Sequence, residues 1–472
     1  MARITRTPVW MLWLVMMAPA GILIVWAIAR GDEQPPLLLA AGPFLVCFVL
    51  YWYLVQRGRI PPQPRSPSAS VGESPQPAES PPPEAKEIPA LRPIDSDEET
   101  QLRDCFPWTV YALRQLEYRP QAVICRGQLR TNPEDAYQTV RDKVDRLFGD
   151  RFLLVFHEGM VGKPFFVLVP NPQGNVSETD ESLDRPGLAA ALLFITLFTT
   201  TYIGAELAGI SAEEFRSNPQ LLLSGLGYSL PLMAILGVHE FGHYLAAKLH
   251  NIRVTLPYFI PFPLFLGTFG AFVQIRSPMP NRRALFDISI AGPLAGFVAT
   301  IPFLLWGLGH SNIVPATESS GLVTFEELKP TFSLLLSALS KLSLGDAISA
   351  DKAIDLHPVA ISGYLGLILT AFNLMPVGQL DGGRIVHAML GKRSAIAIGQ
   401  VARLFMLVLA AIHPELLLWA ILLFLMPIRD EPALNDVSDL DNLRDFLGVF
   451  ALAVLVSILL PLPGTLASAW GI

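Results

Sequence analysis

Two histidines and a glutamate lie together in an apolar stretch of this 472-residue chain, in the run HEFGH at residues 239–243. On a helix with 3.6 residues per turn, His239 and His243 fall one turn apart on the same face, where both imidazoles can bind one metal ion. Glu240 would project beside them, where its carboxylate can take a proton from a water molecule. Zinc suits imidazole and carboxylate ligands with one position left open for water. The motif therefore predicts a metal-dependent hydrolytic site with one Zn²⁺ per chain.

A catalytic zinc ion needs a third protein ligand, which the neighbourhood of the motif does not supply. Ala246 stands where the longer HExxHxxGxxH pattern has glycine, and no further histidine follows at its place. The best candidate is Asp381, in the run NLMPVGQLDGGR at 373–384, which closes an apolar span with turn residues and so frees its backbone to aim a carboxylate. Asp287 is the rival because it also lies in a span, although as a helix-start acid it could instead pair with neighbouring arginines.

The composition places these residues in a membrane. Hydrophobic residues make up 51% of the chain and charged residues 16%, against about 25% charged in a typical soluble domain. Several uncharged runs reach the roughly 20 residues that cross a bilayer. The three cysteines are too few for a disulfide framework, and a net charge of −7 without a lysine-rich tract gives no sign of nucleic acid as a partner. A soluble enzyme, a disulfide-rich secreted scaffold and a disordered protein are excluded, which leaves a multi-pass membrane protein.

We expect a mainly α, polytopic membrane fold with about nine transmembrane helices. Two would form an N-terminal hairpin within residues 1–57, and the others are expected at 187–206, 219–248, 284–309, 357–376, 396–412, 414–428 and 443–462. The apolar segment 254–280 is broken by prolines and glycines. It predicts a re-entrant, β-hairpin-like segment that is shielded by protein, because lipid would leave its backbone amides unsatisfied.

Four regions follow from these patterns: the hairpin at 1–57, a Pro/Ser-rich linker at 58–94, a small α+β soluble domain at 95–175 and a polytopic core at 185–465. Eleven prolines between positions 61 and 93 mark the linker, since this composition cannot bury a core. In the soluble domain the pattern predicts helices at 106–116 and 133–148. Strands are predicted at 151–157 and 164–169, joined by a hairpin.

Topology connects the two halves of the proposed site. If residues 60–186 lie inside, counting spans returns the chain to the same side at Lys248 and Arg253, and again at Asp381 and Arg384, in agreement with the positive-inside rule. His243 precedes Lys248 by five residues, or about 7.5 Å of helix. Both halves then reach the same membrane face at a similar depth, which supports Asp381 as the third ligand.

The HExxH run, together with Asn373, Pro376 and the pair Asp381-Gly382, resembles the site-2 protease family of intramembrane zinc metalloproteases, peptidase family M50. Within that family the chain is most similar to the EGY-like group, which has no PDZ domain. That group carries a Gly-Asn-Leu-Arg motif, and residues 127–130 (GQLR) match it except at Gln128. The resemblance covers most of residues 120–430.

The resemblance implies a role for each residue. His239, His243 and Asp381 would hold zinc, and Glu240 would act as general base and then as general acid. Asn373 would hydrogen-bond the substrate or the developing oxyanion, although a helix-end amide can also simply satisfy local backbone.

Residues 266–276 alternate small and large side chains after a proline-rich approach. A transmembrane helix must be unwound before it is cut, and a strand edge could supply replacement hydrogen bonds. We expect 266–276 to form that edge, as similar segments are thought to do in the family, with Gly267, Gly270, Phe272 and Gln274 as substrate-binding residues. Plain packing is the alternative.

The function implied is a zinc-dependent endopeptidase that cleaves transmembrane segments of membrane proteins within the lipid bilayer, near the cytoplasmic or equivalent face. The soluble domain would be a substrate filter or adaptor site. Two alternatives remain: a catalytically silent relative that binds membrane proteins, and a metal or ion transporter. Because a span follows the first few residues directly, a bacterial inner membrane is favoured over a plastid membrane. The sequence does not indicate an oligomeric state.

Overall fold

A computed structural model describes most of the chain after the linker, in nine stretches: 93–119, 122–159, 162–171, 185–263, 266–315, 328–349, 352–412, 416–428 and 430–471. All of these residues belong to one compact unit. The expected membrane hairpin at 1–57 and nearly all of the expected linker lie outside the described residues.

The soluble domain is a four-stranded antiparallel sheet with two helices. Its elements are α3 (Ser96–Asp104), β1 (Tyr111–Arg119), β2 (Ala122–Leu129), α4 (Pro133–Phe148), the 3₁₀ turn η1 (Gly149–Arg151), β3 (Phe152–Glu158) and β4 (Pro164–Pro170). The strands lie in the order β1-β2-β4-β3. Helix α4 begins as predicted, because Asn132 caps it by accepting a hydrogen bond from the Glu134 amide and Pro133 occupies its first turn. The predicted helix at 133–148 and both predicted strands are confirmed.

The helix predicted at 106–116 is wrong, since β1 occupies most of that stretch. Strand β1 pairs with β2 along its whole length, but the register shifts between Leu113 and Gln115. This irregularity breaks the alternation that marks a strand and leaves Leu113 and Leu116 three residues apart, a spacing typical of a helix face. Strand β2 was not predicted.

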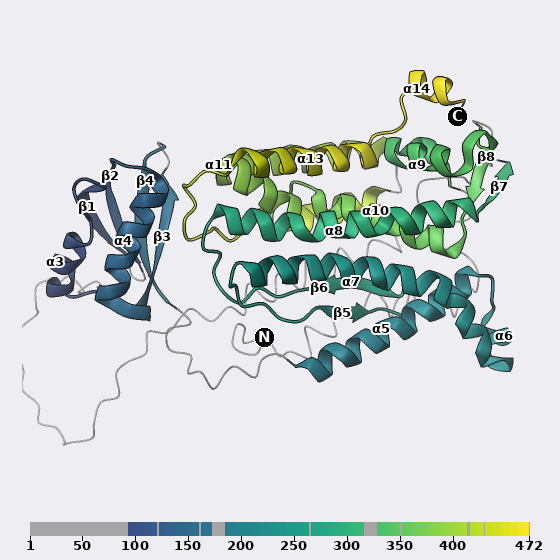
Figure 1. The fold of residues 1–472 in the computed structure, drawn as a ribbon, viewed down its shortest axis with the longest axis horizontal. Helices are drawn as coiled ribbons and strands as arrows, with labels where there is room; N and C mark the ends of the chain where they lie inside the picture. Colours follow the sequence, from purple (N-terminus) through teal and green to yellow (C-terminus); the bar gives the residue numbers. More distant parts are fainter. Residues whose placement is uncertain are drawn as a thin grey trace, which may run out of the picture. The chain divides into compact units, whose positions relative to one another are not determined.

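The membrane part is mainly helical, with two short two-stranded sheets, β5-β6 and β7-β8. In chain order its elements are α5 (Pro186–Leu207), α6 (Ala212–Ser217), η3 (Pro219–Gly225), α7 (Leu226–Leu249), β5 (Tyr258–Pro261), β6 (Thr268–Phe272), α8 (Arg282–Gly309), β7 (Asn312–Pro315), η4 (Pro330–Phe332), α9 (Leu334–Leu344), η5 (Gly345–Ala347), β8 (Lys352–Asp355), α10 (Pro358–Leu374), α11 (Asp381–Ile412), α12 (Leu417–Leu425), α13 (Asn442–Leu459) and α14 (Gly464–Trp470). Figure 1 shows α7 and α8 running side by side, with α10 and α13 alongside α8.

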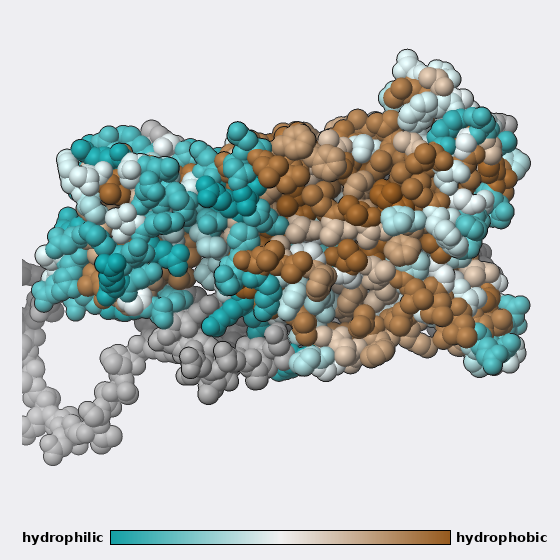
Figure 2. All heavy atoms as spheres, in the orientation of Figure 1, coloured by the Kyte–Doolittle hydropathy of each residue, from teal (hydrophilic) through white to brown (hydrophobic). Residues whose placement is uncertain are grey.

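Five of the described helices are long and apolar enough to cross a membrane: 186–207, 219–249, 282–309, 381–411 and 442–459. The expected span 357–376 corresponds to the 17-residue α10, and 414–428 to the nine-residue α12. Helix α11 begins at Asp381 rather than near 396, and is broken at Gly391, whose φ is 80°. The expected total of about nine spans is therefore not confirmed. Apolar side chains cover much of the visible surface of these helices, as Figure 2 shows.

The expected β-hairpin within 254–280 is confirmed. Strands β5 and β6 pair antiparallel, Phe259 opposite Ala271, and an isolated bridge joins Val254 to Ile275. The hairpin lies against α5 through β5 and against α7 through β6. It therefore borders the helix that carries the HEFGH run.

Candidate metal centre

The histidines of α7 face the first residue of α11. The Nε2 atoms of His239 and His243 lie 3.2 Å apart. Oδ2 of Asp381 lies 3.2 Å from Nε2 of His243 and 3.7 Å from Nε2 of His239. Among the residues that the structure describes, these three form the one group of His, Cys, Asp or Glu side chains able to share a metal ion.

The spacing of these atoms fits zinc. A tetrahedral ion with bonds of about 2.0–2.2 Å keeps its ligand atoms roughly 3.3–3.6 Å apart. The three separations of 3.2, 3.2 and 3.7 Å lie close to that interval. Two imidazoles and one carboxylate are also a donor set typical of catalytic zinc, with the fourth position left for water. The residues present therefore fit one Zn²⁺.

Helix α8 orients the imidazole of His243. Its Nδ1 lies 2.7 Å from the carbonyl oxygen of Ile288, and since a carbonyl only accepts, Nδ1 must donate. The lone pair of the neutral ring is then on Nε2, the atom that faces Asp381. A second hydrogen bond of this kind is the usual way in which a metal-binding histidine is held in one tautomer.

Two glycines on α8 make room for the rings. A Cβ at Gly292 would lie 2.1 Å from Nε2 of His243, and a Cβ at Gly296 would lie 3.0 Å from Nδ1 of His239. Neither glycine was among the predicted site residues, although the small-xxx-small spacing on a membrane helix predicts close packing of some kind. The sequence alone does not show how α7 and α8 are aligned, and this alignment places the two glycines opposite the histidines.

Glu240 is buried beside the three candidate ligands, with 7% of its surface exposed. Its carboxylate interacts with the charges of His243 and Asp381 and with the backbone amide of Val273, directly after β6. The residue expected to move protons thus lies between the ligand set and the hairpin.

A tight turn between α10 and α11 places Asp381. Gly378 has a φ of 52°, which favours glycine, and a Cβ there would lie 1.9 Å from the carbonyl oxygen of Pro427. Gly382 packs equally close to the carbonyl oxygen of Leu374, the last residue of α10. The glycines therefore let the start of α11 fold back against the end of α10, as the turn residues of the run predicted.

Asn373 also points toward the ligands. Its Nδ2 lies 3.4 Å from Nε2 of His239, a long contact that leaves the amide next to the position a metal ion would occupy. The Asn373 side chain is therefore placed for contact with a group bound near His239.

The residues expected to bind substrate lie along the hairpin rather than around the three ligands. Gly267 has a φ of 79°, and its carbonyl accepts a hydrogen bond of 2.7 Å from the Thr199 hydroxyl on α5. Gly270 has a φ of 102° with open space beside it, and the Phe272 side chain is exposed. The backbone amide of Gln274 donates a hydrogen bond to the Thr255 hydroxyl, which joins the two sides of the hairpin at its base.

The rival ligand Asp287 is engaged elsewhere. Arg444 on α13 binds both of its carboxylate oxygens at 2.7 Å, and Nε2 of His250 lies 2.9 Å from one of them. The geometry brings Asp381, and not Asp287, to the two histidines of the motif.

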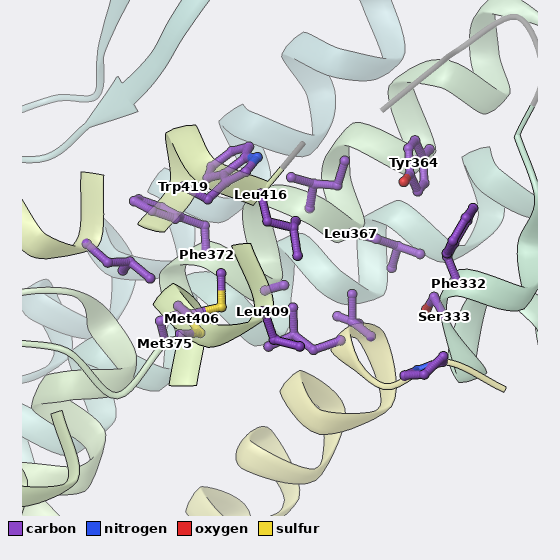
Figure 3. A pocket seen from close by; sticks show the side chains of 16 residues that line it. Phe332, Ser333, Tyr364, Leu367, Phe372, Met375, Met406, Leu409, Leu416 and Trp419 are labelled. Carbon is purple, nitrogen blue, oxygen red and sulfur yellow. The ribbon is translucent and has the colours of Figure 1, made fainter. Parts of the chain in front are cut away.

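An apolar pocket is lined mainly by α10, α11, α12 and α13. Its cavity volume is about 170 Å³, and Phe372, Met375, Met406 and Trp419 are among its walls (Figure 3). None of its lining residues is a histidine, cysteine, aspartate or glutamate, so it cannot hold the metal.

The GQLR run of the soluble domain lies on β2 and its end, far along the chain from the ligands. A Cβ at Gly127 would lie 2.4 Å from the carbonyl oxygen of Ala112, so β1 and β2 need a glycine there. Arg130 stacks on Trp108, with its guanidinium 4.2 Å from the ring centre. These contacts give the run a structural role inside the domain.

Comparison with known proteins identifies the class. The sequence model of peptidase family M50 matches residues 227–412, and that of the EGY3 middle domain matches residues 100–176. The chain belongs to peptidase family M50, and its relatives are EGY-type zinc metalloproteases.

Two relatives illustrate the match. A probable zinc metalloprotease EGY2, chloroplastic, from Oryza sativa subsp. indica is 32% identical over 351 residues, covering 72% of this chain and 62% of the relative. A probable zinc metalloprotease EGY1, chloroplastic, from Arabidopsis thaliana is 30% identical over 381 residues, covering 75% and 68%. The chain spans about three fifths of the length of the first of these relatives. No solved structure matches.

Proposed function

We propose that this protein is a zinc-dependent endopeptidase that cleaves transmembrane segments of other membrane proteins. The observation that carries the proposal is the meeting of three ligand atoms within 3.7 Å of one another, beside a buried glutamate, on helices long enough to cross a membrane. A carboxylate and two imidazoles are expensive to place among apolar helices, so such a cluster indicates function.

His239, His243 and Asp381 would hold the ion. Zinc bound there would polarise the scissile carbonyl and bring the pKa of a coordinated water towards about 7. Glu240 is placed to accept the proton of the attacking water and then to deliver it to the leaving amine. Asn373 would donate to the oxygen on which negative charge develops, since its amide lies beside His239.

The hairpin would hold the substrate. Strand β6 pairs with β5 on one edge, and residue 273 at its end touches Glu240 through the backbone. An unwound segment added along β6 would exchange its lost helical hydrogen bonds for strand hydrogen bonds, next to the proposed general base. Gly267, Gly270, Phe272 and Gln274 are the residues that we assign to this contact.

The membrane is the natural setting of the site, and a multi-pass membrane protein follows from the apolar helices. The relatives are named chloroplastic, which supports a plastid membrane and gives no support to the bacterial inner membrane that the sequence favoured. We also propose that the soluble domain filters substrates or receives an adaptor.

The decisive experiment combines zinc content with cleavage of a model transmembrane substrate in liposomes. Wild-type protein is compared with Glu240→Gln and Asp381→Asn. We expect Glu240→Gln to keep one zinc and to lose cleavage by about 10²–10⁴-fold, and Asp381→Asn to lose zinc as well. A silent binding protein would hold zinc without cleaving any substrate, and a transporter would tolerate Glu240→Gln. Wild-type protein without zinc would refute the proposal.

A further inference from the structure

The loop between α12 and α13 joins the soluble domain to the membrane part through backbone hydrogen bonds. The amide of Phe156 on β3 donates to the carbonyl oxygen of Leu434 at 2.6 Å, and the amide of Asp436 donates back to the carbonyl oxygen of Phe156 at 3.0 Å. On its other side the loop bonds to residues 279–280, where the amides of Leu434 and Asn435 donate at 2.8 and 3.0 Å. Residues 434–436 therefore form a bridging segment, in which Asn435 makes isolated β-bridges to Phe156 on the outer edge of the sheet and to Asn281 just before α8.

A buried cluster of charged side chains lies at this junction. Oδ1 of Asp436 is 3.1 Å from Nε of Arg282 and 3.0 Å from Nε2 of His387. Its Oδ2 is 3.3 Å from Nδ1 of His157, which belongs to β3. The other ring nitrogen of His387 is 2.6 Å from Asp430. Asp436 and Arg282 are buried, and His387 is completely enclosed.

The charges of this cluster balance. Both ring nitrogens of His387 face carboxylate oxygens, and both can donate only when the ring is protonated. Burial raises the pKa of Asp436, but hydrogen bonds from His157 and His387 and the charge of Arg282 outweigh it and hold the pKa well below its usual range. Asp430 and Asp436 are thus matched by Arg282 and His387. Loss of one member leaves a buried charge unpaired, which is costly.

Each cation that binds Asp436 lies on an element that also serves the metal centre. Arg282 opens α8, the helix whose Ile288 carbonyl holds His243. His387 follows Asp381 by six residues on α11, or about 9 Å along the helix. Asp436 therefore ties together the starts of two helices that approach the ligands from different parts of the chain.

We propose that Asp436 is a positioning residue for the metal centre, and that the docked soluble domain, through His157 and β3, is part of the frame that holds the ligands in place. The activity readout rests on the proposed protease function, whereas the docking and metal-release readouts do not. The soluble domain then acts on catalysis by being docked, beyond any role in choosing substrates.

The test uses the full chain in liposomes, with His157→Ala as the main variant. This change removes one contact to Asp436 from the soluble-domain side and touches neither α8 nor α11. We expect kcat for a transmembrane substrate to fall by about tenfold or more, because a small misplacement of reacting groups is enough for such a loss, while KM stays near the wild-type value. Zinc stoichiometry should be unchanged, but release to a chelator should be faster, and hydrogen exchange at the amides of Phe156 and Asp436 should rise.

Two further variants separate positioning from general damage. His157→Gln keeps a side-chain N–H that can donate to Asp436, and it should restore most of kcat and of the amide protection. Asp439→Asn changes an exposed acid of the same loop and should behave as wild type in every measurement. Asp436→Asn should reproduce His157→Ala with larger effects on zinc release.

Unchanged zinc release and unchanged amide exchange in both His157→Ala and Asp436→Asn would overturn the proposal. Equal losses in His157→Ala and His157→Gln, without a change in amide exchange, would also overturn it, because the effect would not pass through the Asp436 contact. If the variants release zinc as expected but the wild-type protein cleaves no substrate, the protease function is refuted. The positioning role of Asp436 would then still stand.

Discussion

Gly292 on α8 lies directly against the imidazole of His243 on α7, and no larger side chain would fit at position 292. A methyl group on Gly292 would lie 2.1 Å from Nε2 of His243, the atom that faces the other metal ligands. Gly296 stands in the same relation to His239 one turn away. The glycines repeat the four-residue spacing of the histidines because α7 and α8 run antiparallel past each other. The backbone of α8 is therefore one wall of the candidate metal centre.

Replacing Gly292 with alanine should weaken zinc binding. The new methyl group would push the His243 ring away from its position, and disturbing the support of a metal-binding histidine costs about 10–100-fold in affinity. Competition with a chromophoric zinc chelator measures the change. Gly237→Ala is the matched control on α7, because its Cβ would lie at an ordinary 3.8 Å from Phe259. Equal zinc affinity in the two variants would contradict the prediction.

Replacing Asp287 with asparagine should leave zinc in place. Asp287 is bound on both oxygens by Arg444 and on one by His250, so its removal breaks a partly exposed ion pair and costs about 1 kcal/mol of stability. Zinc analysis and thermal unfolding in detergent report the two quantities separately. Loss of zinc from this variant would make Asp287 a ligand and would undo the assignment of Asp381.

Replacing Phe272 with proline should abolish cleavage and spare the metal. Phe272 pairs with Tyr258 at the end of β6, and proline has no amide to offer to a strand. Phe272→Ala is the control, since it removes the exposed ring and keeps the amide. We expect one zinc in both variants and a larger loss of cleavage in the proline variant. Similar activity in the two would show that the backbone of β6 does not hold substrate.

The thiols of the soluble domain should be unreactive in the native protein. Cys105 and Cys125 are buried, and burial raises the pKa of both thiols, so little of the reactive thiolate forms at mildly alkaline pH. Labelling with a maleimide should be slow until the protein is denatured. A Cys47→Ser background removes the remaining cysteine from the measurement. Rapid labelling of the native protein would show that the core of this domain opens.

The three candidate metal ligands could be nominated from the sequence because each carries a strong local signal. His239 and His243 follow the helical repeat, and Asp381 stands in a run of turn residues that counting spans brings to the same membrane face. The α8 residues that contact and orient these side chains could not be predicted from the sequence. The carbonyl of Ile288 and the space at Gly292 depend on how α7 and α8 are aligned, and no local pattern records the register between two helices.

The other differences between the predicted and the observed structure have separate causes. His157 and His387 are isolated histidines in the sequence, and only the fold brings them to Asp436. In β1, a bulge gave strand residues the spacing of a helix, so local periodicity led to the wrong element. Helix α11 was placed too late because its first turns carry polar residues, which hydropathy alone assigns to a loop.

The bridging segment at residues 434–436 also implies an order of events during synthesis. Strand β3 leaves the ribosome together with the rest of the soluble domain, whereas its partner segment is made only after α12. Until then the edge of the sheet has no partner, and an open edge is a site where strands of other chains can add. The edge of the newly made soluble domain therefore stays unpaired at Phe156 until residues 434–436 have been synthesised, after the preceding membrane helices.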